Sequence, residues 1–353
     1  MRIAIVAGGT GGHLFPAIRL TEEIKSQPSG EVLFITSRRK QDGGILKEKN
    51  IGFETLPLVG LSSVRPLFIL NFIIRLIAGT VKSGYLLLRF RPCLAIGFGG
   101  YISGPILVLA SLFRIKTIIH EQNVYPGKAN RILANFVNKI AVSFPETIDY
   151  LKKFEKKIIV SGNLLRKGLR RTEKREKTSF TILAMGGSQG AHILNKLIPE
   201  AVGLMQDDKK KILELIHISG PGEKDEVIRS YKDKGIKSRV FSFTMDIGRF
   251  YDESDFVIAR GGATTVAELL HLAKPSILIP YPHADGHQRL NAKVLEDIGL
   301  SILLDEKALV SEDLRETIFR LMDRNTLASM SSKVRDIDTN IEAPHILMKE
   351  IFV

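Results

Sequence analysis

Short apolar runs alternate with longer segments of helical periodicity along the whole chain. The runs are rich in β-branched residues and predict strands. Those of the first half are RIAIVAG, EVLFITS, LAIGFG, KTIIH and KIAVSF, and those of the second half are FTILAMG, ILELIHIS, RVFSF, DFVIAR and PSILIPY. Strands that alternate with helices predict parallel sheets covered by helices, so the expected fold class is α/β.

The two halves repeat the same order of strand, glycine-rich turn and helix. Each opens with such a unit, AIVAGGTGGHLFPAI from Ala4 and ILAMGGSQGAHILN from Ile182. Each also has a second glycine-rich strand exit, GFGGYISGP from Gly97 and ARGGATTVAELL from Ala259. Two Rossmann-like domains follow, with a boundary at Ser161–Arg166, and 353 residues suit two cores. Because open parallel sheets bind ligands beyond their carboxyl ends, we expect the chemistry in the cleft.

Positive charge is concentrated in the first half of the chain. The first 160 residues hold 22 Lys and Arg against 10 Asp and Glu, whereas the remainder is nearly balanced within a net charge of +13. This asymmetry predicts an anionic partner for the first half, either acidic lipid or a phosphorylated substrate. No nucleic-acid motif accompanies it, so nucleic acid is not an expected partner. Cys93, the single cysteine, suits a reducing cytoplasm and is expected to be buried.

Glycine-rich turns between strand and helix let backbone N–H groups approach a phosphate. One such loop is a weak signal, but two in each half are a strong one. His13 ends the first loop and is a candidate general base, although a lone histidine is more often structural. Glu268 follows the last loop, where it could compensate a helix dipole or accept hydrogen bonds from ribose hydroxyls. The spacing of His283 and His287 predicts no metal site, because prolines and glycine interrupt any helix there.

The segment from Pro66 to Pro92 is the most apolar part of the chain. Its longest charge-free run ends at Ile74, which is shorter than the roughly 18 apolar residues of a membrane-spanning helix. If the segment is helical, Arg75, Lys82 and Arg89 form one basic stripe beside a broad apolar face. The pattern is typical of a core helix with a solvated edge or of an interfacial helix that binds anionic lipid.

Six ordered blocks of this sequence resemble those of a known family. They are GGTGGHLFPA at Gly8, GFGGYISGP at Gly97, HEQNVYPGKANR at His120, GGSQGAHILN at Gly186, RGGATT at Arg260 with Glu268, and HQRLNA at His287. The family is that of the UDP-N-acetylglucosamine:undecaprenyl-diphosphate-muramoylpentapeptide N-acetylglucosaminyltransferases of bacterial peptidoglycan synthesis, the MurG family. The resemblance covers essentially the whole chain.

The resemblance implies a GT-B fold, two Rossmann-like domains facing across a cleft. Residues 1–162 would bind the acceptor and the membrane, 163–341 the UDP-sugar, and 342–353 would return to the first domain as a helix. The implied enzyme is an inverting transferase that acts peripherally at the cytoplasmic side of the cell membrane, in cell-wall biogenesis and thus in cell shape, division and cycle. Its implied partners are UDP-N-acetylglucosamine, undecaprenyl-diphosphate-muramoylpentapeptide and anionic lipid, and no cofactor or metal is required.

With this acceptor, the position of His13 on its glycine loop predicts that it is the catalytic base acting on the 4-hydroxyl of the muramoyl sugar, and the resemblance implies further site residues. Positions that match contacts to donor or acceptor are Thr10, Gly11, Gly12, Asn123, Arg166, Ser188, Gln189, Arg260, Ala263, Thr264, Thr265, Glu268, Gln288 and Asn291. Four alternatives remain open at this point: a glycolipid-forming transferase of the same fold, a UDP-sugar 2-epimerase, an NAD-dependent oxidoreductase and a non-enzymatic membrane scaffold.

Overall fold

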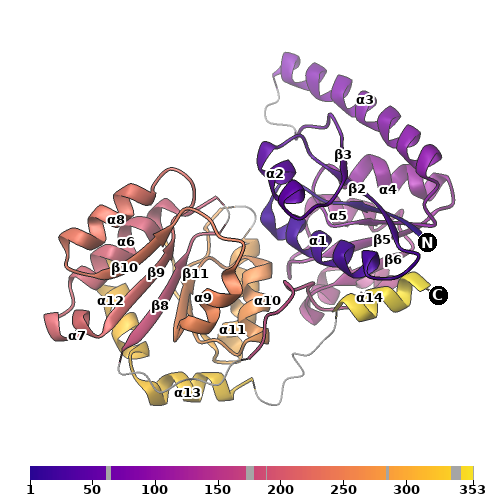
Figure 1. Ribbon diagram of the computed structural model, residues 1–353. Helices are drawn as coiled ribbons and strands as arrows, with labels where there is room; N and C mark the ends of the chain where they lie inside the picture. The colour runs from indigo at the N-terminus through magenta and orange to yellow at the C-terminus, as the bar shows by residue number, and fades with distance from the viewer. Residues whose placement is uncertain (61–64, 172–178, 188, 284–285, 335–342, 353) are drawn as a thin grey trace. The chain divides into compact units, whose positions relative to one another are not determined.

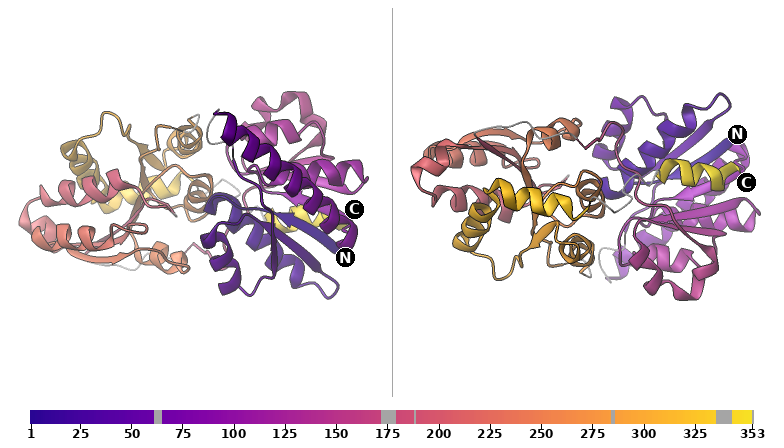
Figure 2. Two further views of the ribbon diagram at one scale, coloured as in Figure 1. Left: turned by 90° about the horizontal axis from the view of Figure 1, so that it is seen from above. Right: turned by 90° about the horizontal axis from the view of Figure 1, so that it is seen from below.

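The chain forms two compact units, each built on one parallel sheet (Figure 1). The computed structural model describes residues 1–60, 65–171, 179–187, 189–283, 286–334 and 343–352. Unit 1 comprises Met1–Lys167 with Ile341–Val353, and unit 2 comprises Gly168–Asn340. Helices cover both faces of each sheet (Figure 2). The α/β class expected from the sequence is confirmed.

The sheet of unit 1 has the strand order β3-β2-β1-β4-β5-β6-β7. Its strands are β1 (Arg2–Val6), β2 (Glu31–Thr36), β3 (Phe53–Thr55), β4 (Leu94–Gly97), β5 (Lys116–Glu121), β6 (Lys139–Val142) and β7 (Ile158–Val160). The helices are α1 (Gly11–Lys25), α2 (Lys40–Glu48), α3 (Pro66–Phe90), α4 (Ser103–Leu112), α5 (Lys128–Leu133) and α14 (Ala343–Phe352), with 3₁₀ turns η1 (Pro145–Tyr150) and η2 (Lys152–Lys157). Helix α14 packs against α1, so the end of the chain belongs to unit 1.

The sheet of unit 2 has the strand order β10-β9-β8-β11-β12-β13. Its strands are β8 (Phe180–Met185), β9 (Leu213–Ile218), β10 (Lys237–Phe241), β11 (Phe256–Ala259), β12 (Ser276–Leu278) and β13 (Ser301–Leu303). The helices are α6 (His192–Gly203), α7 (Asp207–Lys211), α8 (Lys224–Asp233), α9 (Ile247–Glu253), α10 (Ala263–His271), α11 (His287–Asp297), α12 (Ser311–Leu321) and α13 (Arg324–Ser332). The order reverses between β8 and β11, as it does between β1 and β4 in unit 1.

The ten strands predicted from apolar runs are all present, whereas β3, β7 and β13 were missed. Each missed strand has three residues and lies at an edge of its sheet. An edge strand pairs with one neighbour only and is less fully covered, so its apolar run is short and its pattern weak. The central strands β1 and β11 are buried almost throughout and carry the strong signal.

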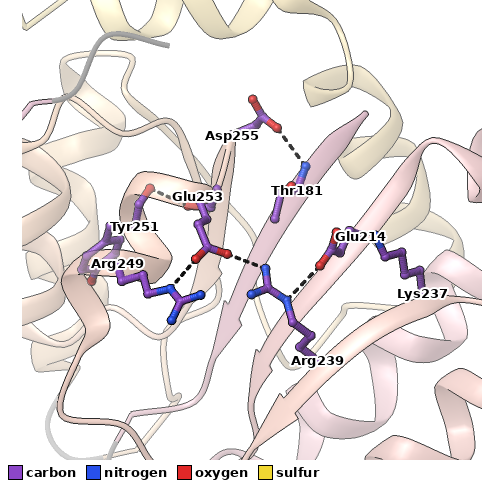
Figure 3. Close-up of polar contacts among 9 residues, drawn as sticks. Thr181, Glu214, Lys237, Arg239, Arg249, Tyr251, Glu253 and Asp255 are labelled. Carbon is purple, nitrogen blue, oxygen red and sulfur yellow. Dashed lines mark hydrogen bonds and ion pairs between the residues drawn. The ribbon is translucent and has the colours of Figure 1, made fainter. Parts of the chain in front are cut away.

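Charged side chains join the beginnings of several strands in unit 2 (Figure 3). Glu214 accepts from Arg239 at 2.8 Å and pairs with Lys237 at 3.0 Å. Arg239 also reaches Glu253, which pairs with Arg249. These arginines and lysine hold the pKa values of both glutamates below their usual range, against the opposing effect of burial. The network lies at the amino ends of β9 and β10, opposite the loops that carry ligands in such sheets.

The expectation that Cys93 is buried is wrong, because its side chain is exposed. The residue immediately precedes β4, and its thiol donates to the backbone oxygen of Arg2 at 3.2 Å. Solvent reaches this edge of the sheet, where the parallel strands begin. The apolar character of a cysteine therefore did not predict its position.

Candidate active site

Three polar segments of unit 1 meet at the carboxyl ends of β1, β4 and β5. These strands are parallel neighbours, and the order of the sheet reverses between β1 and β4. The two glycine-rich turns lie against each other, since a Cβ on Gly100 would lie 3.4 Å from the backbone oxygen of Gly8. A reversal of this kind is where open α/β sheets bind their ligands.

Three predicted residues, Thr10, Gly11 and Gly12, form the start of α1. The backbone oxygen of Thr10 accepts from the N–H of His13 at 3.2 Å, which closes the first turn. Asp42, a buried carboxylate that sequence reasoning missed, accepts from the N–H of Gly9 at 3.0 Å. Because the first N–H groups of a helix have no partner within it, this end of α1 suits an anion.

His13, the predicted base, is half-buried in the first turn of α1. Its Nδ1 lies 2.9 Å from Oε1 of Gln122. The ring packs over Gly99, where a Cβ would lie 3.2 Å from its Cε1 and where φ is +93°. Among the residues that the structure describes, Nε2 of His13 has no hydrogen-bond partner. A side chain at position 99 would displace this ring.

The sequence reasoning did not single out His120 and Gln122, although both stand in a block that it quoted. His120 is fully buried, and burial lowers its pKa to about 4. Its Nε2 lies 3.2 Å from the backbone oxygen of Gly162, and its Nδ1 lies 3.0 Å from Nε2 of Gln122. The available signal was a run of polar residues at the end of the apolar strand KTII, where parallel strands present their functional groups.

Glu121 is a buried carboxylate that organises the loop after β5. It accepts from the N–H and the side chain of Asn123 at 2.9 and 3.1 Å, from the N–H of Gly127 at 2.9 Å, and from Asn130 at 2.8 Å. A buried charge requires such donors. Asn123, a predicted contact residue, is therefore held in place by Glu121.

Arg166, predicted as a donor contact, lies in unit 1. Its guanidinium carbon lies 4.3 Å from the ring centre of Phe15 in α1, a cation–π contact. Unit 1 extends to Lys167, five residues beyond the boundary expected at 162.

In unit 2 the loop after β8 depends on glycines for close backbone approach. A Cβ on Gly190, where φ is +77°, would lie 2.3 Å from the backbone oxygen of Ser219. Gln189 is exposed on this loop, whereas Ser188 lies outside the described residues. Helix α6 begins at His192, so its amino end follows the loop directly, as α1 follows the loop in unit 1.

Glu268 is buried within α10 rather than exposed at its start. The first turn of this helix holds no acidic residue, so the alternative of helix-dipole compensation is wrong. Its Oε2 accepts from the hydroxyl of Tyr251 at 2.9 Å. Ala263 and Thr264 are buried in the first turn beside the half-buried Thr265, and among the described residues the Thr264 hydroxyl has no hydrogen-bond partner.

Three more predicted residues tie the loop after β11 to its neighbours. Arg260 pairs with Glu306 and donates to the backbone oxygen of Ile279 at 2.9 Å. Asn291 donates to the backbone oxygen of Gly261 at 3.2 Å, and Gln288 accepts from the N–H of Tyr281 at 2.9 Å. These bonds fix the loop between β11, β12 and α11.

Helix α3 presents one apolar face to solvent over its full length. The exposed large apolar residues at helical spacing on this face are Leu67, Leu70, Ile74, Ile77, Val81, Tyr85 and Leu88. The opposite face packs against the rest of unit 1 only in the second half of the helix, where Gly79, Ser83, Leu86 and Leu87 are buried, whereas no residue of its first half is buried. A solvated-edge core helix would bury its apolar face, so that alternative does not describe α3.

The basic stripe of α3 is only partly available. Lys82 pairs with Glu54 at 3.0 Å, whereas Arg75 and Arg89 bond to uncharged neighbours on α3 itself. The helix is also long and apolar enough to cross a membrane, by length and composition alone. The sequence criterion of one uninterrupted charge-free run was therefore too strict, because a membrane-spanning helix can contain an occasional charged residue.

In the described part of the chain, no group of three or more His, Cys, Asp or Glu is arranged to hold a metal ion.

The sequence matches two family models that together cover most of the chain. Residues 3–142 match the N-terminal domain of glycosyltransferase family 28, and residues 181–343 match its C-terminal domain. Among curated relatives, the UDP-N-acetylglucosamine–N-acetylmuramyl-(pentapeptide) pyrophosphoryl-undecaprenol N-acetylglucosamine transferase of Myxococcus xanthus is 35% identical, with 94% of this chain and 88% of the relative covered. The transferase of that name from Desulfotalea psychrophila is 37% identical, covering 91% and 88%.

Solved structures show the same fold. The MurG structure from Acinetobacter baumannii superposes with a TM-score of 0.77 at 26% identity and covers 99% of both chains. A UDP-N-acetylglucosamine 2-epimerase superposes with a TM-score of 0.69 at 14% identity, covering 99% of this chain and 95% of that one, which is a likeness of fold alone.

Proposed function

The chain belongs to the MurG family within glycosyltransferase family 28, and from this we infer that it transfers N-acetylglucosamine from UDP-N-acetylglucosamine to the lipid-linked muramoylpentapeptide. The observation that carries this conclusion is identity of 32 to 37% to transferases of that one name, over nearly their full length. The fold is GT-B, and the enzyme is a UDP-N-acetylglucosamine-dependent hexosyltransferase of peptidoglycan synthesis.

The activity is tested by incubating the enzyme with UDP-N-acetylglucosamine, with and without the muramoylpentapeptide lipid. A transferase releases UDP and forms a lipid-linked disaccharide only when the acceptor is present. An epimerase, whose fold this chain shares, changes the sugar without any acceptor, and that result would contradict the inference.

For the chemical step, His13 is the catalytic base of one inverting displacement. The 4-hydroxyl oxygen of the muramoyl sugar forms a bond to the anomeric carbon, and the bond from that carbon to the UDP oxygen breaks with its electron pair leaving on UDP. The hydroxyl proton goes to His13. This role is supported by the position of His13 where the strand order of the sheet reverses. Its Nδ1 is hydrogen-bonded to Gln122, whereas its Nε2 has no hydrogen-bond partner among the described residues.

For the donor, unit 2 binds UDP-N-acetylglucosamine at the carboxyl ends of β8 and β11. The glycines after β8 admit a diphosphate close to the backbone, and the amino end of α6 favours its charge. Glu268 accepts hydrogen bonds from the ribose, and the buried hydroxyl of Thr264 supplies a further polar group. Arg260, Gln288 and Asn291 then act mainly by holding the loops.

The enzyme is a peripheral membrane protein, and its attachment is through α3. The exposed apolar face of this helix enters the interfacial region, while Arg75 and Arg89 meet anionic headgroups at the cytoplasmic side. The charge excess of the first half of the chain supports an acidic surface as partner. Packing of α3 against α4 favours a helix that lies on the membrane over one that crosses it.

A further inference from the structure

A chain of four hydrogen-bonding groups runs from the backbone of Gly162 to His13. The Gly162 oxygen lies 3.2 Å from Nε2 of His120, and Nδ1 of His120 lies 3.0 Å from Nε2 of Gln122. Oε1 of Gln122 then lies 2.9 Å from Nδ1 of His13. The last of these contacts joins two residues, Gln122 and His13, that are 109 positions apart in the sequence.

The direction of the first link is fixed because a carbonyl oxygen can only accept. Nε2 of His120 must therefore carry a hydrogen. Burial lowers the pKa of His120 to about 4, so the ring is neutral at physiological pH and has one hydrogen only. Its Nδ1 is consequently an acceptor.

The orientation of the Gln122 amide is fixed by two acceptors on the same side. Its Nε2 lies 3.0 Å from Nδ1 of His120 and 3.0 Å from the backbone oxygen of His120. An amide oxygen there would face another carbonyl oxygen, so this atom is the donating nitrogen. The amide oxygen must then face His13, and it too can only accept.

We propose that Gln122 and His120 are positioning residues that hold neutral His13 with its hydrogen on Nδ1 and its lone pair on Nε2. This inference rests on the proposed role of His13 as base. The hydrogen bond made by one ring nitrogen decides which nitrogen is protonated. Nε2 then accepts the proton of the acceptor hydroxyl, Nδ1 keeps its own, and Oε1 of Gln122 faces the positive ring that results.

The residues around His13 and His120 restrict the rotation of both imidazole rings. Gly99 lies against the ring of His13, and the ring of Phe98 lies 5.3 Å from that of His120. Asn130 also donates to the backbone oxygen of His120 at 3.3 Å. The geometry thus fixes the orientation of both rings as well as the order of the hydrogens.

The direct test is nitrogen NMR of the full-length enzyme labelled with ¹⁵N-histidine, in which the two neutral forms of imidazole give distinct shifts. The His13 signals, assigned with His13→Ala, are expected to show a hydrogen on Nδ1. Gln122→Met keeps the size of the side chain but removes the acceptor, and the His13 signals should move toward the other form. His217→Gln, which removes a histidine of similar burial and pKa in unit 2, should leave them unchanged.

The kinetic test separates positioning from folding. Losing the orienting partner of a catalytic histidine has cost about 10⁴ in kcat where the partner was a carboxylate, so Gln122→Met should lower kcat by roughly 10² or more, with KM for UDP-N-acetylglucosamine nearly unchanged. Gln122→Glu keeps an acceptor facing Nδ1 of His13 and should retain more of kcat than the methionine variant. Thermal unfolding of each variant checks that unit 1 remains folded.

Two results would overturn the inference. Unchanged His13 signals in folded Gln122→Met would show that the chain does not set the position of the hydrogen. Changed signals with unchanged kcat would remove the catalytic part and would take His13 out of the role of base. The transferase activity of the wild-type enzyme is measured in the same assay, so a failure of the proposed function is distinguished from a failure of this inference.

Discussion

Each unit buries one neutral histidine in its sheet, but only one of the two is connected to a candidate base. Burial lowers the pKa of His120 on β5 and of His217 on β9 to about 4. His120 is linked through Gln122 to the half-buried ring of His13. His217 is bonded to the hydroxyl of Tyr231 at 2.8 Å and to Asn195 at 3.0 Å.

The polar chain of unit 2 continues through Asn195 to Glu223, whose carboxylate also lies 3.2 Å from Nδ1 of the exposed His192. Asn195 donates to the backbone oxygen of Ser219 at 2.9 Å and to Glu223 at 2.8 Å, so it fixes α6 against the end of β9. Two units of the same architecture therefore use a buried histidine differently. In unit 1 we propose that the polar chain orients His13 toward a ligand. In unit 2 the polar chain fixes α6 to Ser219, which lies against the glycine loop at Gly190. Variants that alter one chain and not the other can test this distinction.

The largest expected effect comes from removing the side chain of His13, the last group in the series of hydrogen bonds in unit 1. His13→Ala should lower kcat by roughly 10²-fold to 10⁴-fold, the usual contribution of a general base. The affinity for UDP should change little, because the donor site is assigned to unit 2. Steady-state kinetics and calorimetry with UDP measure the two quantities, and near-normal turnover would exclude His13 from the mechanism.

The outer surfaces of the units differ as well, since exposed apolar residues line one face of α3 in unit 1 but are scattered in unit 2. Each arginine near an acidic bilayer contributes about 1 kcal/mol, so Arg75→Gln with Arg89→Gln should weaken binding to anionic vesicles roughly 30-fold. Lys82→Gln is the matched control and should have a smaller effect, because Lys82 is paired with Glu54. Cosedimentation at low and high salt measures this, and binding by the double variant equal to wild type would contradict the proposal.

The donor site of unit 2 is expected to depend on Glu268 rather than on the hydrogen bonds of His217 and Asn195. Hydrogen bonds to a charged group contribute about 1.5 to 3 kcal/mol, so Glu268→Ala should weaken UDP binding roughly tenfold or more. Calorimetric titration measures the dissociation constant. Glu268→Gln keeps the size of the side chain and one acceptor, so its dissociation constant should lie between those of the wild type and of Glu268→Ala. An unchanged constant in folded Glu268→Ala would leave Glu268 with a structural role only.

The last prediction concerns stability in acid rather than activity or binding. The unfolded chain protonates its histidines near pH 6.5, whereas folded His120 and His217 have pKa values of about 4, so the unfolded state binds more protons between these values. Stability is therefore lost as pH falls from 6.5 to 4, by about 1.4 kcal/mol per pH unit for each histidine. The free energy of unfolding, measured with denaturant at pH 7, 6 and 5, should therefore fall less steeply in His217→Gln than in the wild type, because the contribution of one of the two histidines is removed. An identical slope in the variant would show that His217 does not contribute.

Sequence reasoning found the parts of the candidate site that local pattern controls. The glycine loops after β1, β4, β8 and β11 could be predicted because a tight strand-to-helix turn requires glycine at adjacent positions in the chain. His13 was singled out because it ends such a loop, and Glu268 because it lies in the helix that follows one. Asp42, Glu121 and Gln122 were missed as site residues, because their partners are decided by packing and the sequence shows no regular spacing between them.

By itself, the sequence determined two Rossmann-like units, their central strands, the four glycine loops and the family, since strand and helix periodicities and turn residues are local properties. Only the tertiary structure decided that Gln122 contacts His13 across 109 positions, that Lys82 is paired with Glu54 and that Cys93 is exposed. Such contacts depend on which strands become neighbours and which ends of the sheet meet solvent. A hydrogen bond between residues far apart in the chain requires two matching groups at one point in space, and no spacing along the sequence records that point.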